Sequence, residues 1–531
     1  MTKKNNNTNA WSRLPGLLFF FMMTVILVIC LLPRERYSGR NYLGAFEPNR
    51  PLLFVAGILL TVVLVFLFKK TGLASRIKIN KQFLLCAFLF SFVLQIVASY
   101  HYYFVTDWDV KKVFDLSYAI AHQADVTEFK GYFSRYPNNL VLAYFFSLVI
   151  SLAHKLGFHQ LEYYALIVVQ CFLNTAAGLL LITSIKQLFH NDFLCFLGYL
   201  FYICLVGISP WVVVPYSDSM GLIFPVLILN IYLFKSIDTP EKSADSHWIT
   251  DIVKWFLIAL ISYIGYKIKP QIIILLMGII LAEIYTKLVH FRQVKISLLK
   301  LIRIVTALCL GFVMAISLTN IMSQKTKVPL NPERAFGPAH FLMMGLNPET
   351  NGGYYRPDVD FSGSFATTAE RNSANIAVAA ERVKEMGPSN LCRHLIKKVL
   401  INYNDGSFFW GGEGTFYKEV PEETNHLLCS FFRNIYYNRE NPGKYYSAWF
   451  QFVQMIWITV LFFTVLAGLR KQDTRQSAIM IALIGLTLFE LLFEARSRYL
   501  FAYVPLYIIL AMWGIEMLIS KKSNTNKSKS H

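Results

Sequence analysis

The sequence predicts an all-α polytopic membrane protein of about 12–13 hydrophobic helices with one extracytoplasmic domain that is α-rich or irregular. Of its 531 residues, 55% are hydrophobic, and the mean hydropathy is +0.44. Soluble domains contain about 45–50% apolar residues. The apolar residues also occur in blocks close to the roughly 20 residues that a helix needs to cross the hydrocarbon core. A single long polar stretch, residues 323–448, separates these blocks.

The apolar blocks justify the membrane helices one by one. They lie near residues 14–32, 52–68, 83–99, 139–156, 161–185, 193–211, 219–235, 254–268, 270–288, 299–322, 449–469, 476–493 and 499–519. The first block is interpreted as a retained span rather than a signal peptide, because Pro33-Arg34-Glu35-Arg36 follows it in place of a small-residue cleavage site.

The basic residues orient these helices. The net charge is +19, and many Lys and Arg residues lie in short loops beside spans, as the positive-inside rule expects. This distribution argues against nucleic-acid binding. It places both chain ends in the cytoplasm and the segments 100–138 and 323–448 outside. Two inner ends require an even number of crossings, about twelve, so either 139–156 or 161–185 is expected not to cross.

Four parts of the chain follow from this topology. We expect an N-terminal transmembrane domain at 1–322 that carries the first outer loop at 100–138, and an extracytoplasmic domain at 323–448. C-terminal transmembrane helices at 449–520 and a basic cytoplasmic tail at 521–531 complete the chain.

The extracytoplasmic domain carries its own helix signals. Thr367 and Glu370 form a capping box, Gly387-Pro388 interrupts the run, and Asn404-Asp405-Gly406 ends a second helix. The Gly-rich stretch 410–414 is either a flexible surface over a substrate or an ordinary loop tip. Of the eight Cys residues, only Cys392 and Cys429 lie in this domain, and spacing does not decide whether they are bonded.

The first outer loop contains the acidic motif Asp107-Trp108-Asp109. A carboxylate here could act as a general base, since a base needs only to reach the proton with a suitable pKa. The alternative is that Asp107 and Asp109 are a solvated loop edge or a helix N-cap. A divalent cation is a candidate cofactor, but two carboxylates are too few to establish a metal site.

Further charged residues lie at the other predicted outer turns. Lys267 and Lys269 precede Pro270, and they would either snorkel to lipid headgroups or bind a phosphate. Arg496 and Arg498 follow Glu494 in a short hairpin, where Glu494 either pairs with Arg498 or belongs to a site that binds phosphate. Glu490 and Glu494 are spaced to share one helix face.

Asp218 lies in a further outer hairpin. Its position before Ser219 favours a helix cap over a place in a cavity.

Together these motifs resemble the GT-C superfamily of integral membrane glycosyltransferases, and more closely the bacterial relatives of the protein O-mannosyltransferase group (glycosyltransferase family 39-like). The resemblance extends over most of the chain, although each motif is short. It rests on the acidic motif at 107–109, Tyr136-Pro137-Asn138-Asn139, Tyr216-Ser217-Asp218, Ile268-Lys269-Pro270, and Arg498-Tyr499 before Pro505. The stretch 337–346, which contains His340, is similar to the start of the soluble loop in Gram-positive cell-envelope members. One feature departs from the pattern, because two spans precede the one that leads to the acidic loop.

The resemblance implies an inverting transfer of sugar from a polyprenyl-phosphate donor to a surface glycan or teichoic-acid-like acceptor, at the outer face of the cell membrane, in cell-wall biogenesis. It makes Asp109, or alternatively Asp107, the catalytic base. The candidate donor-phosphate ligands are Arg135, Lys267, Lys269, Arg496 and Arg498, and the remaining candidates for lining the site are Tyr136, Asp218, His340, Glu494 and Tyr499. Two alternatives stay open: a polymerase or ligase of lipid-linked oligosaccharide, and a flippase or transporter, although the chain shows no internal repeat.

Overall fold

The computed structural model describes residues 13–32, 51–234, 248–289, 298–414, 416–423, 425–438 and 442–520. The N-terminal lysines, the arginines at 34–50 and the basic tail at 521–531 lie outside these ranges. Within them the chain is almost entirely helical, which confirms the predicted all-α membrane fold.

Ten of the described helical segments are long and apolar enough to cross a membrane. They are α2 (Leu14–Leu31), α3 (Pro51–Lys70), α5 (Lys81–Tyr102), α9 with its preceding turn (His159–Phe189), α13 (Trp248–Ile268), α14 with its preceding turn (Pro270–Val289), α15 (Leu298–Lys325), α20 (Tyr446–Ala467), α21 (Thr474–Leu492) and Ser497–Ile519, which contains η10 (Ser497–Tyr503) and most of α22 (Val504–Ser520).

Three of the predicted blocks form shorter apolar helices. They are Asn139–Lys155, which is α8, then Asp192–Gly207 and Ser217–Leu233. Of the two blocks expected not to cross, 161–185 lies in a helical segment of 31 residues, whereas α8 has 17. Asp192–Gly207 and Ser217–Leu233 are similarly short, and of the two candidates α8 is the shorter. Its exposed apolar residues Leu148 and Leu152 lie on one face, as in a helix that rests against lipid.

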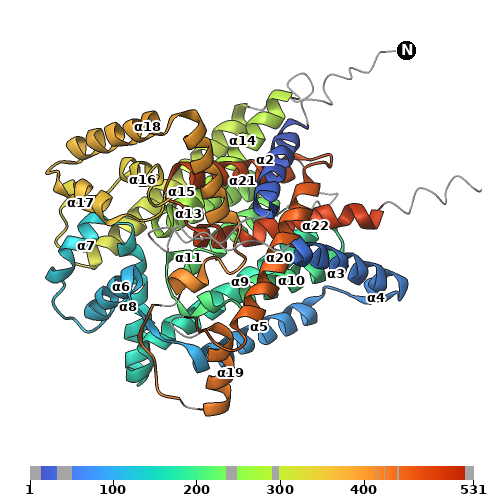
Figure 1. Ribbon diagram of the computed structural model, residues 1–531, viewed down its shortest axis with the longest axis horizontal. Coiled ribbons are helices and arrows are strands. Elements are labelled where there is room, and N and C mark those ends of the chain that lie inside the picture. Colours follow the sequence, from blue (N-terminus) through green and yellow to red (C-terminus); the bar gives the residue numbers. More distant parts are fainter. Residues whose placement is uncertain are drawn as a thin grey trace, which may run out of the picture.

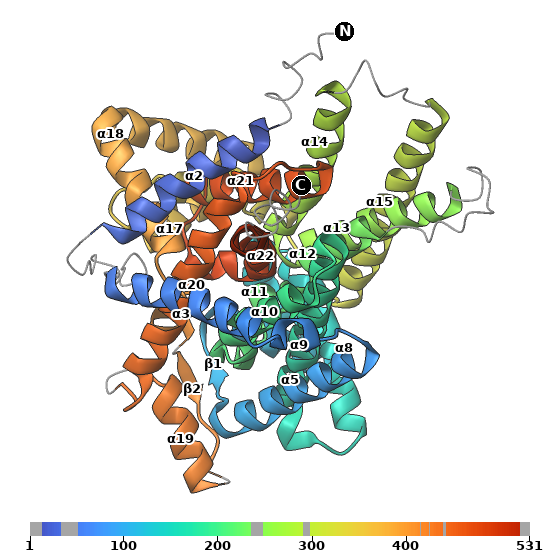
Figure 2. The same ribbon diagram turned by 90° about the vertical axis from the view of Figure 1, so that its right-hand side faces the viewer.

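Helix packing in the membrane part uses small residues. Along α15, Ala307, Gly311, Ala315 and Thr319 recur every fourth position and are buried, whereas Leu310, like other large apolar side chains on α15, is exposed. A Cβ on Gly311 would lie 2.4 Å from the backbone oxygen of a residue in α13. Close backbone approach through small residues, with large residues left facing lipid, is the packing expected inside a bilayer. Figure 2 shows α13, α14 and α15 together at one side of the molecule.

The elements separate toward two ends of the molecule (Figure 1). One end, here called the loop end, carries α6 (Trp108–Ala121), α7 (Lys130–Arg135), α16 (Pro338–Gly345), α17 (Arg356–Ser364) and α18 (Thr368–Tyr403). At the opposite side lie α4 (Leu73–Arg76) and the last turn of α22. Most helices of the two segments that sequence placed outside thus gather at one end, away from the basic loop at α4, whereas α19 (His426–Tyr436) lies at the lower edge of Figure 1.

Backbone hydrogen bonds tie the first polar loop to the long one at two places. Strand β1 (Val105–Thr106) pairs antiparallel with β2 (Tyr417–Glu419). The backbone N–H of Phe336 donates to the carbonyl of Arg135 at 2.9 Å. The short loop that carries the acidic motif is therefore held by the long loop on both sides.

The helices of the long polar loop follow their sequence signals. The side chains of Thr367 and Glu370 form the predicted capping box at the start of α18. Gly387 has φ 61° and kinks α18 before Pro388, and Asn404 caps its end. Inside this loop the Arg382 guanidinium donates two hydrogen bonds to the Asp358 carboxylate, at 2.7 and 2.9 Å. Cys392 is exposed and Cys429 is buried, and both are free.

Candidate functional site

Six buried charged side chains form one network, here called the ion-pair network: Asp218, Lys269, Glu413, Glu494, Arg496 and Arg498. They come from α11 (Ser217–Met220), the turn between α13 and α14, η9 (Trp410–Gly414), and η10 with the connection that precedes it. Segments almost 300 residues apart in sequence thus meet, since Asp218 and Arg498 are separated by 280 positions.

Asp218 joins two cations. One carboxylate oxygen pairs with the Lys269 ammonium and the other with the Arg498 guanidinium. The expectation that Asp218 caps a helix is wrong, because Tyr216 is the N-cap residue of α11 and the Asp218 carboxylate points to the cations instead. Snorkelling is also wrong for Lys269, whose side chain is only 9% exposed.

Glu413 joins the two arginines. It pairs with Arg496, and its Oε2 lies 2.6 Å from Arg498 Nε. The Gly-rich stretch that carries it is neither a flexible surface nor a loop tip. Trp410 at its start is fully buried and donates from Nε1 to the carbonyl of Tyr436 at 2.7 Å.

One alternative from the sequence was that Glu494 pairs with Arg498. In the structure Glu494 pairs with Arg496 instead. The distance from Glu494 Oε1 to Arg496 Nη2 is 2.8 Å, and the Tyr499 hydroxyl donates to Glu494 Oε2 at 3.0 Å. Glu494 does not share a helix face with Glu490, because α21 ends at Leu492. Burial raises the pKa of Glu494, and the charge of Arg498 opposes this shift.

Aromatic faces cover the cations of the network. The Lys269 ammonium lies 3.7 Å from the centre of the Tyr499 ring, and the Arg498 guanidinium lies 4.7 Å from the centre of Trp108. Trp108 in turn packs edge-on against Tyr216, with ring centres 5.2 Å apart. Cation–π contacts of this kind strengthen when water is excluded. Trp108 therefore places the acidic motif directly against the network.

Asp109 lies beside the network in the first turn of α6 and is half-buried. The Tyr132 hydroxyl lies close enough to this carboxylate to affect its pKa, and it accepts from Asn139 Nδ2 at 3.0 Å. Burial raises the pKa of Asp109, while Arg498 and Tyr132 oppose the shift. A carboxylate that is positioned by a neighbour and has a raised pKa is suited to accept a proton.

Asp107 is a helix N-cap, which the sequence offered as the alternative to a general base. Its side chain accepts from the backbone N–H of Trp108 at 2.9 Å as the N-cap of α6, and it is exposed, 3.9 Å from Lys418. The two carboxylates of the motif therefore contact different groups.

Of the other predicted site residues, some lie against the ion-pair network and some do not. Tyr136 lies at the network's edge, where burial raises its pKa and the charges of Asp109 and Glu494 add to the shift. Its ring packs on Phe336 with centres 5.5 Å apart. Arg135 is half-buried and donates from Nε to the carbonyl of Gly131 at 3.2 Å. Lys267 lies 6.0 Å from the centre of the Tyr263 ring and forms no ion pair of the network.

His340 lies inside the long polar loop. It is fully buried, and its Nδ1 lies 2.7 Å from Ser362 Oγ. Burial lowers its pKa to about 4, so the ring is neutral. These contacts make His340 a part of the loop core rather than a side chain that lines the site.

Sequence reasoning missed three charged or polar residues at this site: Tyr132, Lys398 and Glu413. Lys398 is fully buried and donates to the carbonyls of Gly345 and Phe493, the first at 2.8 Å. Glu490 is fully buried, and its two carboxylate oxygens have no hydrogen-bond partner among the described residues. The sequence already indicated Glu490, because an ionisable residue near the membrane is a functional candidate.

A comparison with curated proteins finds no match. The family described as "Conserved hypothetical integral membrane protein" matches residues 8–518, which is nearly the whole chain. The ten candidate spans agree with that description. The chain is thus an integral membrane protein that belongs to this family.

Proposed function

We propose that this protein is an inverting glycosyltransferase of the cell membrane that moves a sugar from a polyprenyl-phosphate donor to a glycan or teichoic-acid-like polymer on the extracytoplasmic face. The observation that carries the proposal is the position of Asp109, a proton acceptor beside three buried cations at the loop end. A lipid-linked donor reaches such a site from the bilayer, and a polymer acceptor reaches it from the aqueous side.

In the proposed reaction, an acceptor hydroxyl attacks the anomeric carbon of the donor sugar from the face opposite the phosphate. The new glycosidic C–O bond forms as the bond between the anomeric carbon and the phosphate oxygen breaks. Asp109 takes the hydroxyl proton, and polyprenyl phosphate leaves with the bonding electron pair. The Tyr132 hydroxyl, held by Asn139, fixes the carboxylate for this step.

The cations of the network would stabilise the departing phosphate. Lys269, Arg496 and Arg498 are each paired with a carboxylate in this structure, so a phosphate must replace one of these partners. Glu494 is the best suited to yield, because its raised pKa eases its protonation. A protonated Glu494 would free Nε and Nη2 of Arg496, while Nη1 stays paired with Glu413. Nε and Nη2 lie on one edge of the guanidinium, and two donors on one edge match the geometry of phosphate oxygens.

The acidic motif contains its own matched control for a test. A strain that lacks this protein is complemented with wild type, Asp109→Asn or Asp107→Asn, and the sugar composition of its envelope polymers is measured. We expect Asp109→Asn to abolish the added sugar and to accumulate the lipid-linked donor, while Asp107→Asn retains the sugar. An unchanged sugar in membranes that contain folded Asp109→Asn would remove Asp109 as the base. Accumulation of unpolymerised repeat units would indicate a polymerase or ligase instead.

A further inference from the structure

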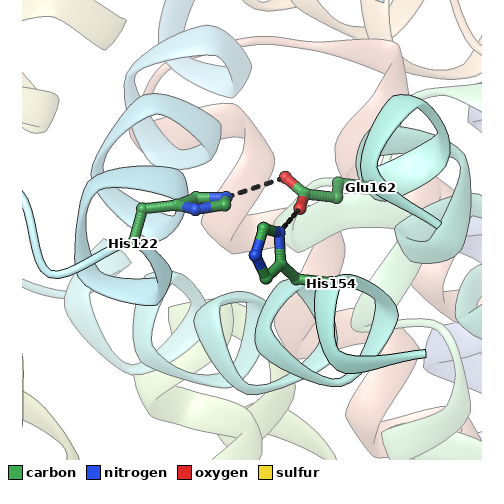
Figure 3. Close-up of side chains that lie close together, drawn as sticks. All are labelled: His122, His154 and Glu162. Carbon is green, nitrogen blue, oxygen red and sulfur yellow. Dashed lines mark hydrogen bonds and ion pairs between the residues drawn. The ribbon is translucent and has the colours of Figure 1, made fainter. Parts of the chain in front are cut away.

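A second group of side chains that could bind a metal lies outside the ion-pair network, where two helices end and a third begins. His122 is the C-cap residue of α6, His154 lies in the last turn of α8, and Glu162 is the first residue of α9. Figure 3 shows the two imidazoles pointing at the two oxygens of the same carboxylate. The distances are 3.0 Å from His122 Nε2 to Oε2 and 2.9 Å from His154 Nδ1 to Oε1.

A fourth side chain joins this group. His159 Nδ1 lies 2.9 Å from His154 Nδ1. His154 Nδ1 therefore faces a carboxylate oxygen and a second imidazole nitrogen at once. If it carries a proton, that one proton is shared between two acceptors. If it does not, two atoms with lone pairs, Nδ1 and the buried Glu162 oxygen, face each other. A cation between these atoms removes the conflict.

We propose that His122, His154 and Glu162 form a zinc site, with His159 or water as the fourth ligand. One ligand atom from each of the three residues lies within 4.8 Å of the others. Ligand atoms around a tetrahedral zinc at about 2.0–2.1 Å lie roughly 3.3 Å apart, so small side-chain rotations close the site. Two or three imidazoles and one carboxylate are a donor set that suits zinc.

The environment of the ligands fits a built site. Glu162 is only 4% exposed, which fixes its carboxylate, while the His154 side chain is 46% exposed and leaves an entry path. The ring of Tyr118 packs on His122, with centres 4.2 Å apart, and holds the imidazole in place. These features match the requirement that a metal site have fixed ligands and an open approach.

The zinc would clamp the ends of α6, α8 and α9. Both α6 and α8 begin beside the candidate site, with Asp109 in the first turn of α6 and Asn139 at the start of α8, and both end at the proposed metal. The ion would therefore fix the far end of the helix that positions Asp109. This role is structural and does not depend on the reaction that the protein catalyses.

The test measures zinc bound to the full chain in detergent, after incubation with zinc sulfate and removal of free ion. Wild type, His122→Gln, His154→Gln and Glu162→Gln are compared, with His426→Gln as the control. His426 is a matched control because it also contacts a carboxylate, Glu423 Oε2 at 2.6 Å, but on an exposed surface. We expect about one zinc per chain in wild type and in the control, and a large loss in each of the three ligand variants.

A second readout covers variants that fail to fold. A chelator added to zinc-loaded wild type should lower the unfolding temperature, because a ligand that binds only the folded state stabilises it. The same chelator should leave metal-free wild type unchanged. Wild type that binds no more zinc than His122→Gln or His154→Gln, or an unfolding temperature that is the same with and without zinc, would overturn the proposal and leave a cluster held by shared protons.

Discussion

Replacing Asp218 with Asn tests whether the ion-pair network is buried from water, so that its cations depend on their carboxylate partners. The substitution keeps the shape of the side chain and removes its charge. Arg498 would still have Glu413, 2.6 Å away, but Lys269 would lose the carboxylate that neutralises it. The ammonium would then lie buried against the Tyr499 ring, with its centre 3.7 Å away, in place of an ion pair.

The expected loss follows from that unpaired charge. Removing one partner of a buried ion pair destabilises a protein by about 3–5 kcal/mol. An exposed pair gives the contrast: the carboxylate of Asp360 is 57% exposed and lies 2.9 Å from Arg356. Asp360→Asn should therefore cost about 0.3–0.5 kcal/mol. The double variant Asp218→Leu with Lys269→Met should recover much of the loss, since it leaves no ammonium without a carboxylate.

The assay is unfolding of the purified protein in mixed micelles, followed by tryptophan fluorescence. Equal losses for Asp218→Asn and Asp360→Asn would refute the reasoning, because they would mean that water reaches Lys269. A double variant less stable than Asp218→Asn would refute it too.

Further predictions concern the long polar loop and its junction with α21. Burial lowers the pKa of Lys398 to about 7 from its ordinary value of 10.5, so between these pH values the unfolded chain binds a proton that the folded chain does not. Stability should therefore rise with pH across this window, and Lys398→Met should flatten the rise in unfolding temperature. Gly387→Ala should lower the free energy of unfolding by about 1 kcal/mol, because φ is 61° there. Gly363→Ala, with open space around the new Cβ, should be neutral or stabilising. Comparing the unfolding temperatures of the two variants tests this difference. Gly345→Ala should destabilise more than Gly387→Ala in the same assay, because its Cβ would lie 2.4 Å from the backbone oxygens of Leu492 and Phe493.

The membrane fold was predictable because block length and apolarity are local properties of the sequence. The capping box at Thr367 and the interruption at Gly387 were predictable for the same reason. The partners of the charged residues were not. Asp218 has a spacing typical of a helix cap, and only the fold brings it to Lys269 and Arg498.

The acidic motif shows the same limit on a finer scale. Asp107 and Asp109 have the same side chain, and their different contacts come from where α6 begins. The helix starts at Trp108, so Asp107 caps it while Asp109 turns toward Tyr132. Glu413 lies among glycines that suggest an open loop, but Trp410 and Glu413 are buried by tertiary packing.

The most direct test of the central claim is transfer by the purified protein. The chain is reconstituted in lipid with polyprenyl-phosphate-linked sugars and with envelope polymer from a strain that lacks it, and sugar incorporated into the polymer is measured. We expect wild type and Asp107→Asn to transfer sugar and Asp109→Asn to lose transfer while its unfolding temperature stays close to that of wild type. Undiminished transfer by folded Asp109→Asn would contradict the account of the site, and no transfer by wild type from any such donor would contradict the proposed activity.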